Sequence, residues 1–273
     1  MDWSLVLASQ GIEHIINYDE TTGWILIVST ADHPVALDHI HEYCLENRYW
    51  RWRHPVFQPG LYFDWSCVIW AFANALMFAG SQRHNLHDPG MMTGAALHSG
   101  EWWRLFTAIL LHADLAHLAM NIVFGMLFLG LAMGSYGPGV GLLAAYLAGA
   151  AGNLVGSWIH EPNLHSLGSS GMVMGALGLL ACPPLILPKG RRIIAFKLLG
   201  GGLLAGILIF VMIGMNPNTD VVAHLGGFIS GWLLGIPLCL KPKLIRTPRI
   251  NLAAGIFFCL LIFVPWWLAL THT

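Results

Sequence analysis

Seven long apolar segments, separated by shorter polar stretches, make up most of the chain after residue 60. A helix of ~20 apolar residues crosses the hydrocarbon core of a bilayer, and each segment has about 17–21 residues. The segments lie near residues 62–80, 115–134, 139–158, 170–186, 194–214, 222–240 and 252–270. The pattern predicts seven transmembrane helices, of which the fourth is short enough to begin below the membrane surface.

The first sixty residues show a different pattern, with eight of the fourteen acidic residues and no long apolar run. Two short strands are predicted over residues 12–16 and 24–29, because the turn-forming residues 19–23 lie between them. Apolar residues at helical spacing predict an amphipathic helix over residues 32–47. We therefore expect a small soluble α+β domain over residues 1–60, which serves stability or regulation rather than chemistry.

Composition points to a polytopic membrane protein. Of the 273 residues, 56% are hydrophobic and 10% are charged, whereas soluble domains carry about 25% charged residues. The net charge of −1 says nothing about nucleic acid. No basic tract or stacking platform favours nucleic acid as a partner, so we expect none. The five cysteines are scattered, so they predict neither a disulfide framework nor a zinc site. The N-terminus lacks the basic-then-apolar pattern of a cleavable signal peptide.

Basic residues predict the orientation in the membrane. Eleven of the thirteen Lys and Arg residues fall on one side if the seven segments alternate across the bilayer. They are Arg48, Arg51, Arg53, Lys189, Arg191, Arg192, Lys197, Lys241, Lys243, Arg246 and Arg249. Because cytoplasmic loops carry an excess of Lys and Arg, we expect the N-terminal domain in the cytoplasm. The connections 81–114, 159–169 and 215–221 then face outward.

The run Gly168-Ser169-Ser170-Gly171 places two hydroxyl groups where the fourth apolar segment begins. A serine at this position can cap the helix. It can also be a nucleophile beside backbone N–H groups that stabilise an oxyanion. On its own the run favours the cap.

His224 changes that balance, because it lies near the outer end of the sixth segment. A histidine inside a membrane helix is costly and indicates a function, although an interhelical hydrogen bond is the alternative. The fourth and sixth segments run in the same direction, so Ser170 and His224 lie at similar depth and can form a nucleophile with its general base. Asp220 is expected to face water rather than to complete a triad. Glycines at short spacing in both segments predict close packing; they are Gly171, Gly175, Gly178, Gly227, Gly231 and Gly235.

His117 and Asn121 share one face of the second segment near its outer end. Together with the backbone N–H of Ser170 they supply the donors that an oxyanion hole needs. Interhelical hydrogen bonding is one alternative, and a zinc site that includes His112 and His224 is another. No HExxH pattern or nearby carboxylate supports zinc, so we expect no metal.

These motifs, with Trp103-Arg104 in the first outer connection, resemble the rhomboid family of intramembrane serine proteases over residues 62–240. They follow the order and topological positions of that family. The resemblance implies an all-α polytopic membrane protein with a six-helix core over residues 61–240. It assigns Ser170 as nucleophile, His224 as general base, and His117, Asn121 and the Ser170 amide as the oxyanion hole. Trp103, Arg104, Gly168, Gly171, Gly227 and Gly231 are implied as structural motif residues, the first two in a loop partly within the outer leaflet.

The resemblance also implies the roles of the remaining parts. Residues 1–60 are similar to the cytoplasmic domain ahead of many bacterial rhomboids, and residues 241–273 to the basic loop and additional helix of the six-plus-one members. The partners implied are transmembrane protein substrates and membrane lipids, without a cofactor. The implied location is a bacterial inner membrane, with the site open to the outer side. The oligomeric state stays open.

Two positions depart from the family pattern. Met174 stands where many members have a tyrosine stacked on the histidine, and Met133 where many have a glutamate. Neither change removes a catalytic group. We expect substrate access between the second and fifth segments, with Phe124 or Phe210 as gate residues and residues 214–220 as a lid.

A different class of function is a membrane protein that binds clients or transports solutes without catalysis. A transporter of this size is expected to contain an internal repeat, and the chain has none. A catalytically dead relative is expected to lack the serine or the histidine, and both are present. The sequence therefore favours cleavage near the outer end of a transmembrane segment that contains helix-weakening residues.

Overall fold

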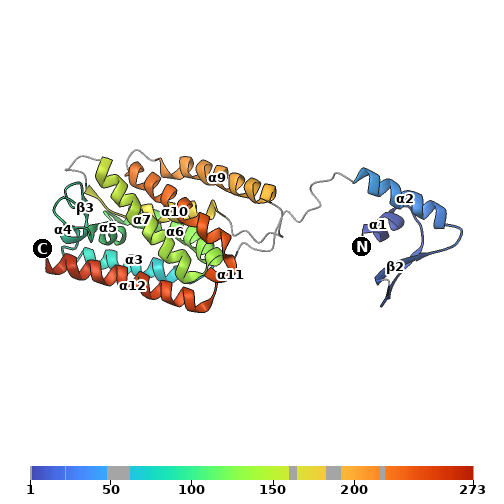
Figure 1. Cartoon of the computed structure of the whole chain (residues 1–273), viewed down its shortest axis with the longest axis horizontal. Coiled ribbons are helices and arrows are strands. Elements are labelled where there is room, and N and C mark those ends of the chain that lie inside the picture. The colour runs from blue at the N-terminus through green and yellow to red at the C-terminus, as the bar shows by residue number, and fades with distance from the viewer. Residues whose placement is uncertain are drawn as a thin grey trace. The chain divides into compact units, whose positions relative to one another are not determined.

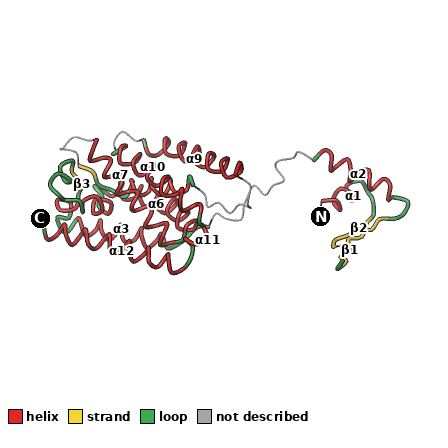
Figure 2. Tube along the Cα trace, viewed as in Figure 1, coloured by secondary structure: helices red, strands yellow, loops and turns green. Residues whose placement is uncertain are grey.

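The computed structural model describes residues 2–21, 23–47, 62–159, 165–182, 192–215 and 219–272. The chain forms two compact units, Met1–Pro59 and Gly60–Thr273. Each is described by itself below. Helices dominate the second unit, and its described strands are short (Figures 1 and 2).

The first unit contains an antiparallel hairpin and two helices. Its elements are α1 (Asp2–Ser9), β1 (His14–Asp19), β2 (Gly23–Val28) and α2 (His33–Glu46). Gly23 adopts a φ of +80° where β2 begins, a conformation that glycine reaches without strain. The predicted strands and the second helix are present, with the first strand two to three residues later than expected. The helix α1 was not predicted, because its eight residues hardly segregate apolar from polar positions.

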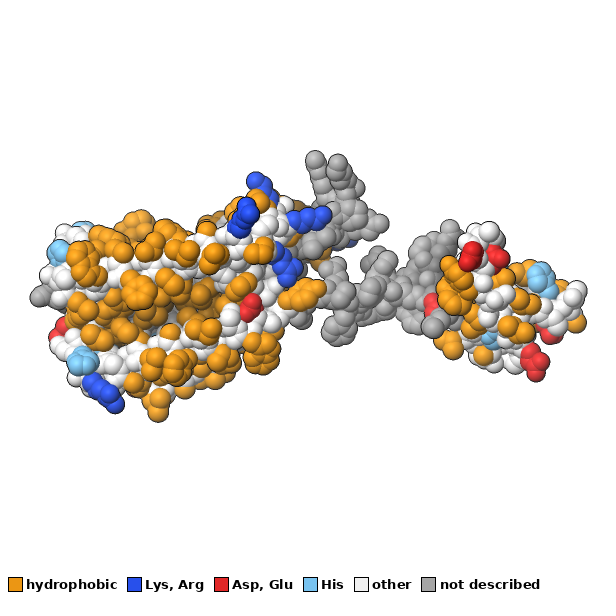
Figure 3. Space-filling model, turned by 90° about the horizontal axis from the view of Figure 1, so that it is seen from below, with side chains coloured by type: hydrophobic (Ala, Val, Ile, Leu, Met, Phe, Trp, Pro, Cys, Tyr) orange, Lys and Arg blue, Asp and Glu red, His pale blue; other side chains and the backbone are white. Residues whose placement is uncertain are grey.

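In the second unit, a helix coincides with each of the seven predicted segments. These helices are α3 (Cys67–Ser81), α6 (Leu115–Tyr136), α7 (Pro138–Ile159), α8 (Ser170–Leu180), α9 (Arg192–Gly214), α10 (Val221–Leu240) and α12 (Pro248–Thr271). Among the described residues, five are long and apolar enough to cross a membrane, while α3 and α8 are shorter apolar helices. Apolar side chains cover the long face of this unit, and Lys and Arg gather at one end (Figure 3). The chain is therefore an integral membrane protein, and its helical fold class is confirmed.

The short helix α8 lies at the centre of the second unit, between α6, α7 and α10. Every residue from Gly171 to Leu179 is buried. A Cβ atom on Gly227 would lie 2.3 Å from the carbonyl oxygen of Gly171, and one on Gly231 would lie 2.0 Å from that of Gly175. The backbones of α8 and α10 thus touch directly, as the glycine spacing predicted.

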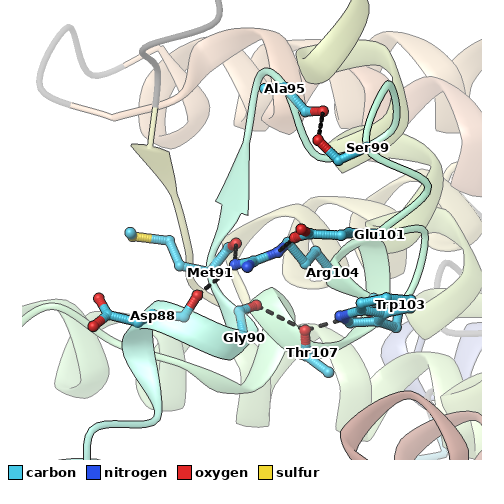
Figure 4. A network of polar contacts seen from close by, with 9 residues as sticks. All are labelled: Asp88, Gly90, Met91, Ala95, Ser99, Glu101, Trp103, Arg104 and Thr107. Atoms are coloured by element: carbon cyan, nitrogen blue, oxygen red, sulfur yellow. Dashed lines mark hydrogen bonds and ion pairs between the residues drawn. The ribbon is translucent and has the colours of Figure 1, made fainter. Parts of the chain in front are cut away.

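The connection between α3 and α6 is folded rather than open. It contains α4 (His87–Gly90), β3 (Met92–Thr93), α5 (Arg104–Thr107) and the 3-10 turn η2 (Ala108–Leu110). The buried guanidinium of Arg104 donates to the carbonyls of Asp88 and Met91 at 2.6 and 2.8 Å and pairs with Glu101 (Figure 4). Sequence patterns did not predict these elements, because a buried arginine that binds carbonyls carries no periodic signal.

Helix α7 fixes the same connection through its polar side chains. The hydroxyl of Tyr146 donates to the carbonyl of Phe106 at 3.0 Å, and the amide of Asn153 donates to that of Leu105 at 2.8 Å. These carbonyls lie in the short helix α5, which is too short to satisfy all its own carbonyl groups. The first connection is therefore held against the bundle by hydrogen bonds.

Helix α12 belongs to the same compact unit and contacts it at both ends. At one end, Asn251 Oδ1 accepts the backbone N–H groups of Gly139 and Val140 at 3.1 and 3.2 Å, so it caps α7. Near the other end, a Cβ atom on Gly90 would lie 2.7 Å from the indole of Trp266. The seventh helix thus supports both α7 and the first connection.

Candidate active site

The structure brings Ser170 and His224 together, although 54 residues separate them in the sequence. Ser170 is the first residue of α8, and His224 lies in the first turn of α10. Ser170 Oγ lies 2.7 Å from His224 Nε2. The imidazole is 4% exposed, whereas the serine is only partly buried. A hydroxyl and an imidazole at this distance can transfer a proton.

A backbone carbonyl orients the histidine ring. His224 Nδ1 lies 2.8 Å from the carbonyl oxygen of Gly214, at the end of α9. A carbonyl can only accept, so Nδ1 carries the proton and Nε2 is left to accept the hydroxyl hydrogen of Ser170. The sequence did not identify the group that orients this ring. Every residue has a backbone carbonyl, and no side chain indicates which carbonyl will lie next to the histidine.

Asp220 serves as a helix cap, which differs from the role of the carboxylate in a catalytic triad. Its Oδ1 accepts the backbone N–H of Ala223 at 2.9 Å and caps α10. Asp114 does the same for α6, because its Oδ1 accepts the backbone N–H of His117 at 2.8 Å. Each of these helices carries a candidate histidine in its first turn, so the two caps fix the helix ends from which the side chains project.

Met174 and Phe210 lie close to Gly214, whose carbonyl oxygen contacts the His224 ring. A Cβ atom on Gly214 would lie 3.3 Å from the sulfur of Met174 and 2.7 Å from Phe210. Phe210 also packs on Phe228, with ring centroids 5.4 Å apart. The other candidate gate residue, Phe124, packs on the neighbouring Phe128.

The side chains of His117 and Asn121 lie close to Gly168, two residues before Ser170. Gly168 has a φ of +122°, and a Cβ atom there would lie 2.6 Å from His117 Nε2 and 3.4 Å from Asn121 Nδ2. Among the described residues, buried Asn121 Nδ2 has no hydrogen-bond partner. The N–H of Ser170 also has no acceptor within its helix, since it opens α8.

A second serine–histidine contact lies next to the first. Ser169 Oγ lies 3.2 Å from His112 Nε2, and both side chains are fully buried. Ser169 occupies the cap position of α8, but its side chain makes no capping hydrogen bond. Burial, together with the neighbouring His117, lowers the pKa of His112 to about 4. Sequence reasoning missed this contact, because it considered His112 only as a metal ligand. Among the described residues, no three His, Cys, Asp or Glu are grouped as a metal site.

The first connection also holds the segment that leads to Ser170. Strand β3 pairs with β4 (His165–Ser166), with Met92 opposite Ser166. The N–H of Gly168 then donates to the carbonyl of Ala108 at 2.9 Å. Trp103 and Arg104 fold this connection rather than contact the serine. Residues 216–218 of the expected lid (214–220) lie outside the described residues.

Several known proteins are similar in sequence to part of this chain. Residues 99–241 match the family model described as the rhomboid domain. RHOMBOID-like protein 1 of Arabidopsis thaliana is 34% identical over 151 residues, which cover 54% of this chain and 37% of that protein. Rhomboid protease GluP of Bacillus subtilis (strain 168) is 34% identical over 154 residues, which cover 54% of this chain and 29% of that protein. Putative rhomboid protease YdcA of the same organism is 33% identical over 151 residues, which cover 53% of this chain and 71% of that protein. The chain thus spans about a third of the length of the first two relatives.

Proposed function

Because the chain belongs to the rhomboid family, whose members are generally intramembrane serine proteases, we propose that it is a serine endopeptidase of this kind. It hydrolyses peptide bonds in or near transmembrane segments of other membrane proteins. The observation that carries this proposal is the 2.7 Å hydrogen bond between Ser170 and His224, with the Gly214 carbonyl on the far side of the ring. Two successive hydrogen bonds thus join the nucleophile, the base and the group that orients the base.

In the acylation step, Ser170 Oγ attacks the scissile carbonyl carbon while His224 Nε2 takes the hydroxyl proton. The Gly214 carbonyl stabilises the resulting imidazolium, as a carboxylate does in a triad. The carbonyl oxygen of the substrate becomes an oxyanion, which His117, Asn121 and the Ser170 N–H stabilise. One such donor is worth about 10²–10³ in kcat.

Collapse of the intermediate breaks the C–N bond, and the imidazolium gives its proton to the departing amine. A water molecule then attacks the acyl-enzyme, with His224 again as the base, and releases the second product. No cofactor takes part. Since a bilayer core holds no water, the site must open to the aqueous phase, and the basic residues orient that opening to the outer side.

The substrate approaches laterally between α6 and α9 in this proposal. Helix α9 packs on α8 and α10 at the edge of the bundle (Figure 1). It is 11% buried, against 22–61% for the other candidate spans, so it is the span that moves with the smallest loss of contacts. A substrate helix must unwind to expose its carbonyl, and Gly or Pro lowers that cost by about 1–3 kcal/mol. Cleavage is expected near its outer end, after a small side chain.

Labelling with a fluorophosphonate tests the nucleophile. The native chain, Ser170→Ala, Ser169→Ala and His224→Ala are compared in liposomes, together with cleavage of a model transmembrane substrate. We expect Ser170→Ala and His224→Ala to lose both labelling and cleavage, and Ser169→Ala to keep both at a reduced rate. A folded native chain that neither labels nor cleaves would contradict the proposal and favour a protein that only binds membrane clients.

A further inference from the structure

The two residues that precede Ser170 each contact a group from a distant part of the chain. The N–H of Gly168 donates to the carbonyl of Ala108 at 2.9 Å. Ser169 Oγ lies 3.2 Å from His112 Nε2. Ala108 and His112 both belong to the segment that leads into α6. Two hydrogen bonds outside the candidate dyad therefore join the start of α8 to this segment.

The Ser169 hydroxyl bonds across elements rather than within its own helix. A serine at the N-cap position ordinarily accepts a backbone N–H of the first helical turn. Ser169 occupies that position of α8, but its side chain makes no capping hydrogen bond. It is fully buried, and so is His112. Buried polar groups are hydrogen-bonded in folded proteins, and the hydroxyl of Ser169 meets this requirement at His112.

His112 also contacts His117, one of the candidate oxyanion donors. The two ring centroids lie 5.3 Å apart, and the ring planes are inclined at 70°. A Cβ atom on Gly168 would lie 2.6 Å from His117 Nε2, so the backbone before Ser169 is close to the same donor. One imidazole thus contacts both the neighbour of the candidate nucleophile and a candidate oxyanion donor.

The contact between Ser169 and His112 joins two neutral groups. Burial, together with the neighbouring His117, lowers the pKa of His112 to about 4, so the ring is neutral at pH 7. A neutral imidazole has one N–H donor and one acceptor nitrogen, and a hydroxyl can donate or accept. The hydrogen bond can therefore form in either tautomer of the ring.

The position of this pair favours a role in the reaction over a role in stability alone. Two apolar side chains of the same shape can replace a buried hydrogen-bonded pair at little cost, so stability by itself does not require the two polar groups. The hydroxyl, however, lies on the residue before Ser170, and the imidazole packs on His117. Loss of the hydrogen bond removes a constraint between the two candidate site residues.

We propose that Ser169 and His112 are positioning residues for the proposed reaction. Their hydrogen bond holds the backbone N–H of Ser170 and the side chain of His117 in the relative places that an oxyanion requires. This inference rests on the proposed function. Both side chains are fully buried, so neither touches the substrate, and their loss slows the chemical step without changing substrate binding. A neutral hydrogen bond corresponds to about a threefold to tenfold change in rate.

Ser169→Thr and Ser169→Val form a matched pair for the test. The two new side chains have the same shape, but only threonine keeps the hydroxyl. Each variant is compared with the native chain in liposomes by the time course of fluorophosphonate labelling and by cleavage of a model transmembrane substrate. The final labelled fraction counts the folded sites, whereas the rate constant of labelling reports how well each site is arranged.

We expect Ser169→Val to reach the same labelled fraction as Ser169→Thr, with a rate constant that is lower by about threefold to tenfold. We expect kcat for cleavage to fall by the same factor, with little change in KM. Equal rate constants for the two variants would overturn the inference. A lower labelled fraction in Ser169→Val with an unchanged rate constant would also overturn it, because that result describes a role in stability alone.

Ser157→Ala is the control for the loss of a serine hydroxyl elsewhere in the bundle. Ser157 is half-buried in α7, and its hydroxyl donates to the carbonyl of Leu154 in the same helix at 2.8 Å. We expect this variant to keep the native labelled fraction, rate constant and kcat. Slowing as large as that of Ser169→Val would contradict a specific effect of the Ser169 hydroxyl.

A double-mutant cycle assigns the effect to His112. Ser169→Ala is introduced into the native chain and into a chain with His112→Phe, which keeps a ring beside His117 but has no ring nitrogen. We expect Ser169→Ala to slow the native chain about threefold to tenfold and the His112→Phe chain less than about twofold, because residues in contact are not additive. Equal slowing in both backgrounds would overturn the inference. The comparison of Ser169→Thr with Ser169→Val decides the matter if His112→Phe does not fold.

The native chain separates this inference from the proposed function. A native chain that labels and cleaves, together with equal rates for Ser169→Thr and Ser169→Val, would overturn the inference and leave the proposed function standing. A folded native chain that neither labels nor cleaves contradicts the proposed function, and the inference falls with it.

Discussion

At the scale of single residues, the candidate site depends on groups that orient its side chains rather than only on the side chains themselves. The Gly214 carbonyl fixes the tautomer of His224 at 2.8 Å. Met174 and Phe210 lie close to this glycine. A backbone group thus takes the place that a third catalytic side chain has in a triad.

Gly214→Ala tests this arrangement. The new Cβ atom would lie 2.7 Å from Phe210, so the carbonyl must shift away from Nδ1. A misplacement of about 1 Å at a reacting group costs about 10²-fold in rate, and we expect kcat to fall by that order with little change in KM. Met174→Leu keeps the bulk beside Gly214 and serves as the control. Unchanged kcat in Gly214→Ala would contradict the role of the carbonyl.

Acid is expected to destabilise the fold through His112. Its pKa of about 4 lies below the ordinary value of 6.5, so below pH 6.5 the unfolded chain binds a proton that the folded chain refuses. The contribution of His112 is complete above pH 6.5 and is lost as the pH falls toward 4. Thermal unfolding in detergent measures this as a falling Tm between pH 7 and pH 4.5. We expect His112→Asn to flatten this fall, and an unchanged slope would contradict the assignment.

At the scale of elements, contact between α8 and α10 brings the serine and the histidine together. A Cβ atom on Gly231 would lie 2.0 Å from the carbonyl oxygen of Gly175, so any larger residue pushes the helices apart. The contact between these two helices continues to Gly171 and Gly227. Gly171 directly follows Ser170 in the chain. Packing at the middle of α8 is therefore coupled to the geometry at its end.

Gly231→Ala is expected to destabilise the fold by about 1–3 kcal/mol, as overpacking does, and to lower activity. Gly201→Ala on α9 is the matched control, because nothing lies within 4 Å of its Cβ position. There we expect unchanged or higher stability, since alanine favours helix by about 0.5–1 kcal/mol over glycine. Thermal unfolding and substrate cleavage measure both variants. Equal effects at the two positions would show that helix propensity, not contact, decides.

At the scale of the whole second unit (Gly60–Thr273), the seventh helix supports the candidate site from a distance. Trp266 of α12 packs on Gly90 and Leu111 of the first connection. His112 follows directly and contacts Ser169, the neighbour of the candidate nucleophile. Asn251 at the other end of α12 caps α7, which binds the first connection as well. Removal of α12 is therefore expected to affect the site even though no residue of this helix lies in it.

Trp266→Ala tests this support. The side chain is 8% exposed, and its loss leaves a cavity that costs about 3–5 kcal/mol. We expect a lower Tm and a lower kcat. Trp267→Ala, at a position that is 62% exposed on the same helix, is expected to change neither. If Trp267→Ala proved as harmful as Trp266→Ala, packing on the first connection would not be the cause.

The pattern of apolar segments was enough to predict the seven long helices of the second unit, their order and the polar residues near their ends. This was possible because bilayer thickness sets helix length, and the apolar runs that satisfy it are local in sequence. The spacing of glycines likewise predicted the contact between α8 and α10, since only glycine permits two helix backbones to touch. These glycines are Gly171, Gly175, Gly227 and Gly231. Ser170 and His224 could be recognised as candidate site residues because they are polar residues in otherwise apolar segments.

The groups that surround those residues became visible only in the folded structure. The Gly214 carbonyl has no side-chain signature, and the Ser169–His112 contact joins groups 57 residues apart. The first connection folds around Arg104, which donates to backbone carbonyls. Every sequence contains such carbonyls, so they give no signal of their own. Each of these depends on which distant groups meet, and hydrophobic period, charge and motif spacing describe only near neighbours along the chain.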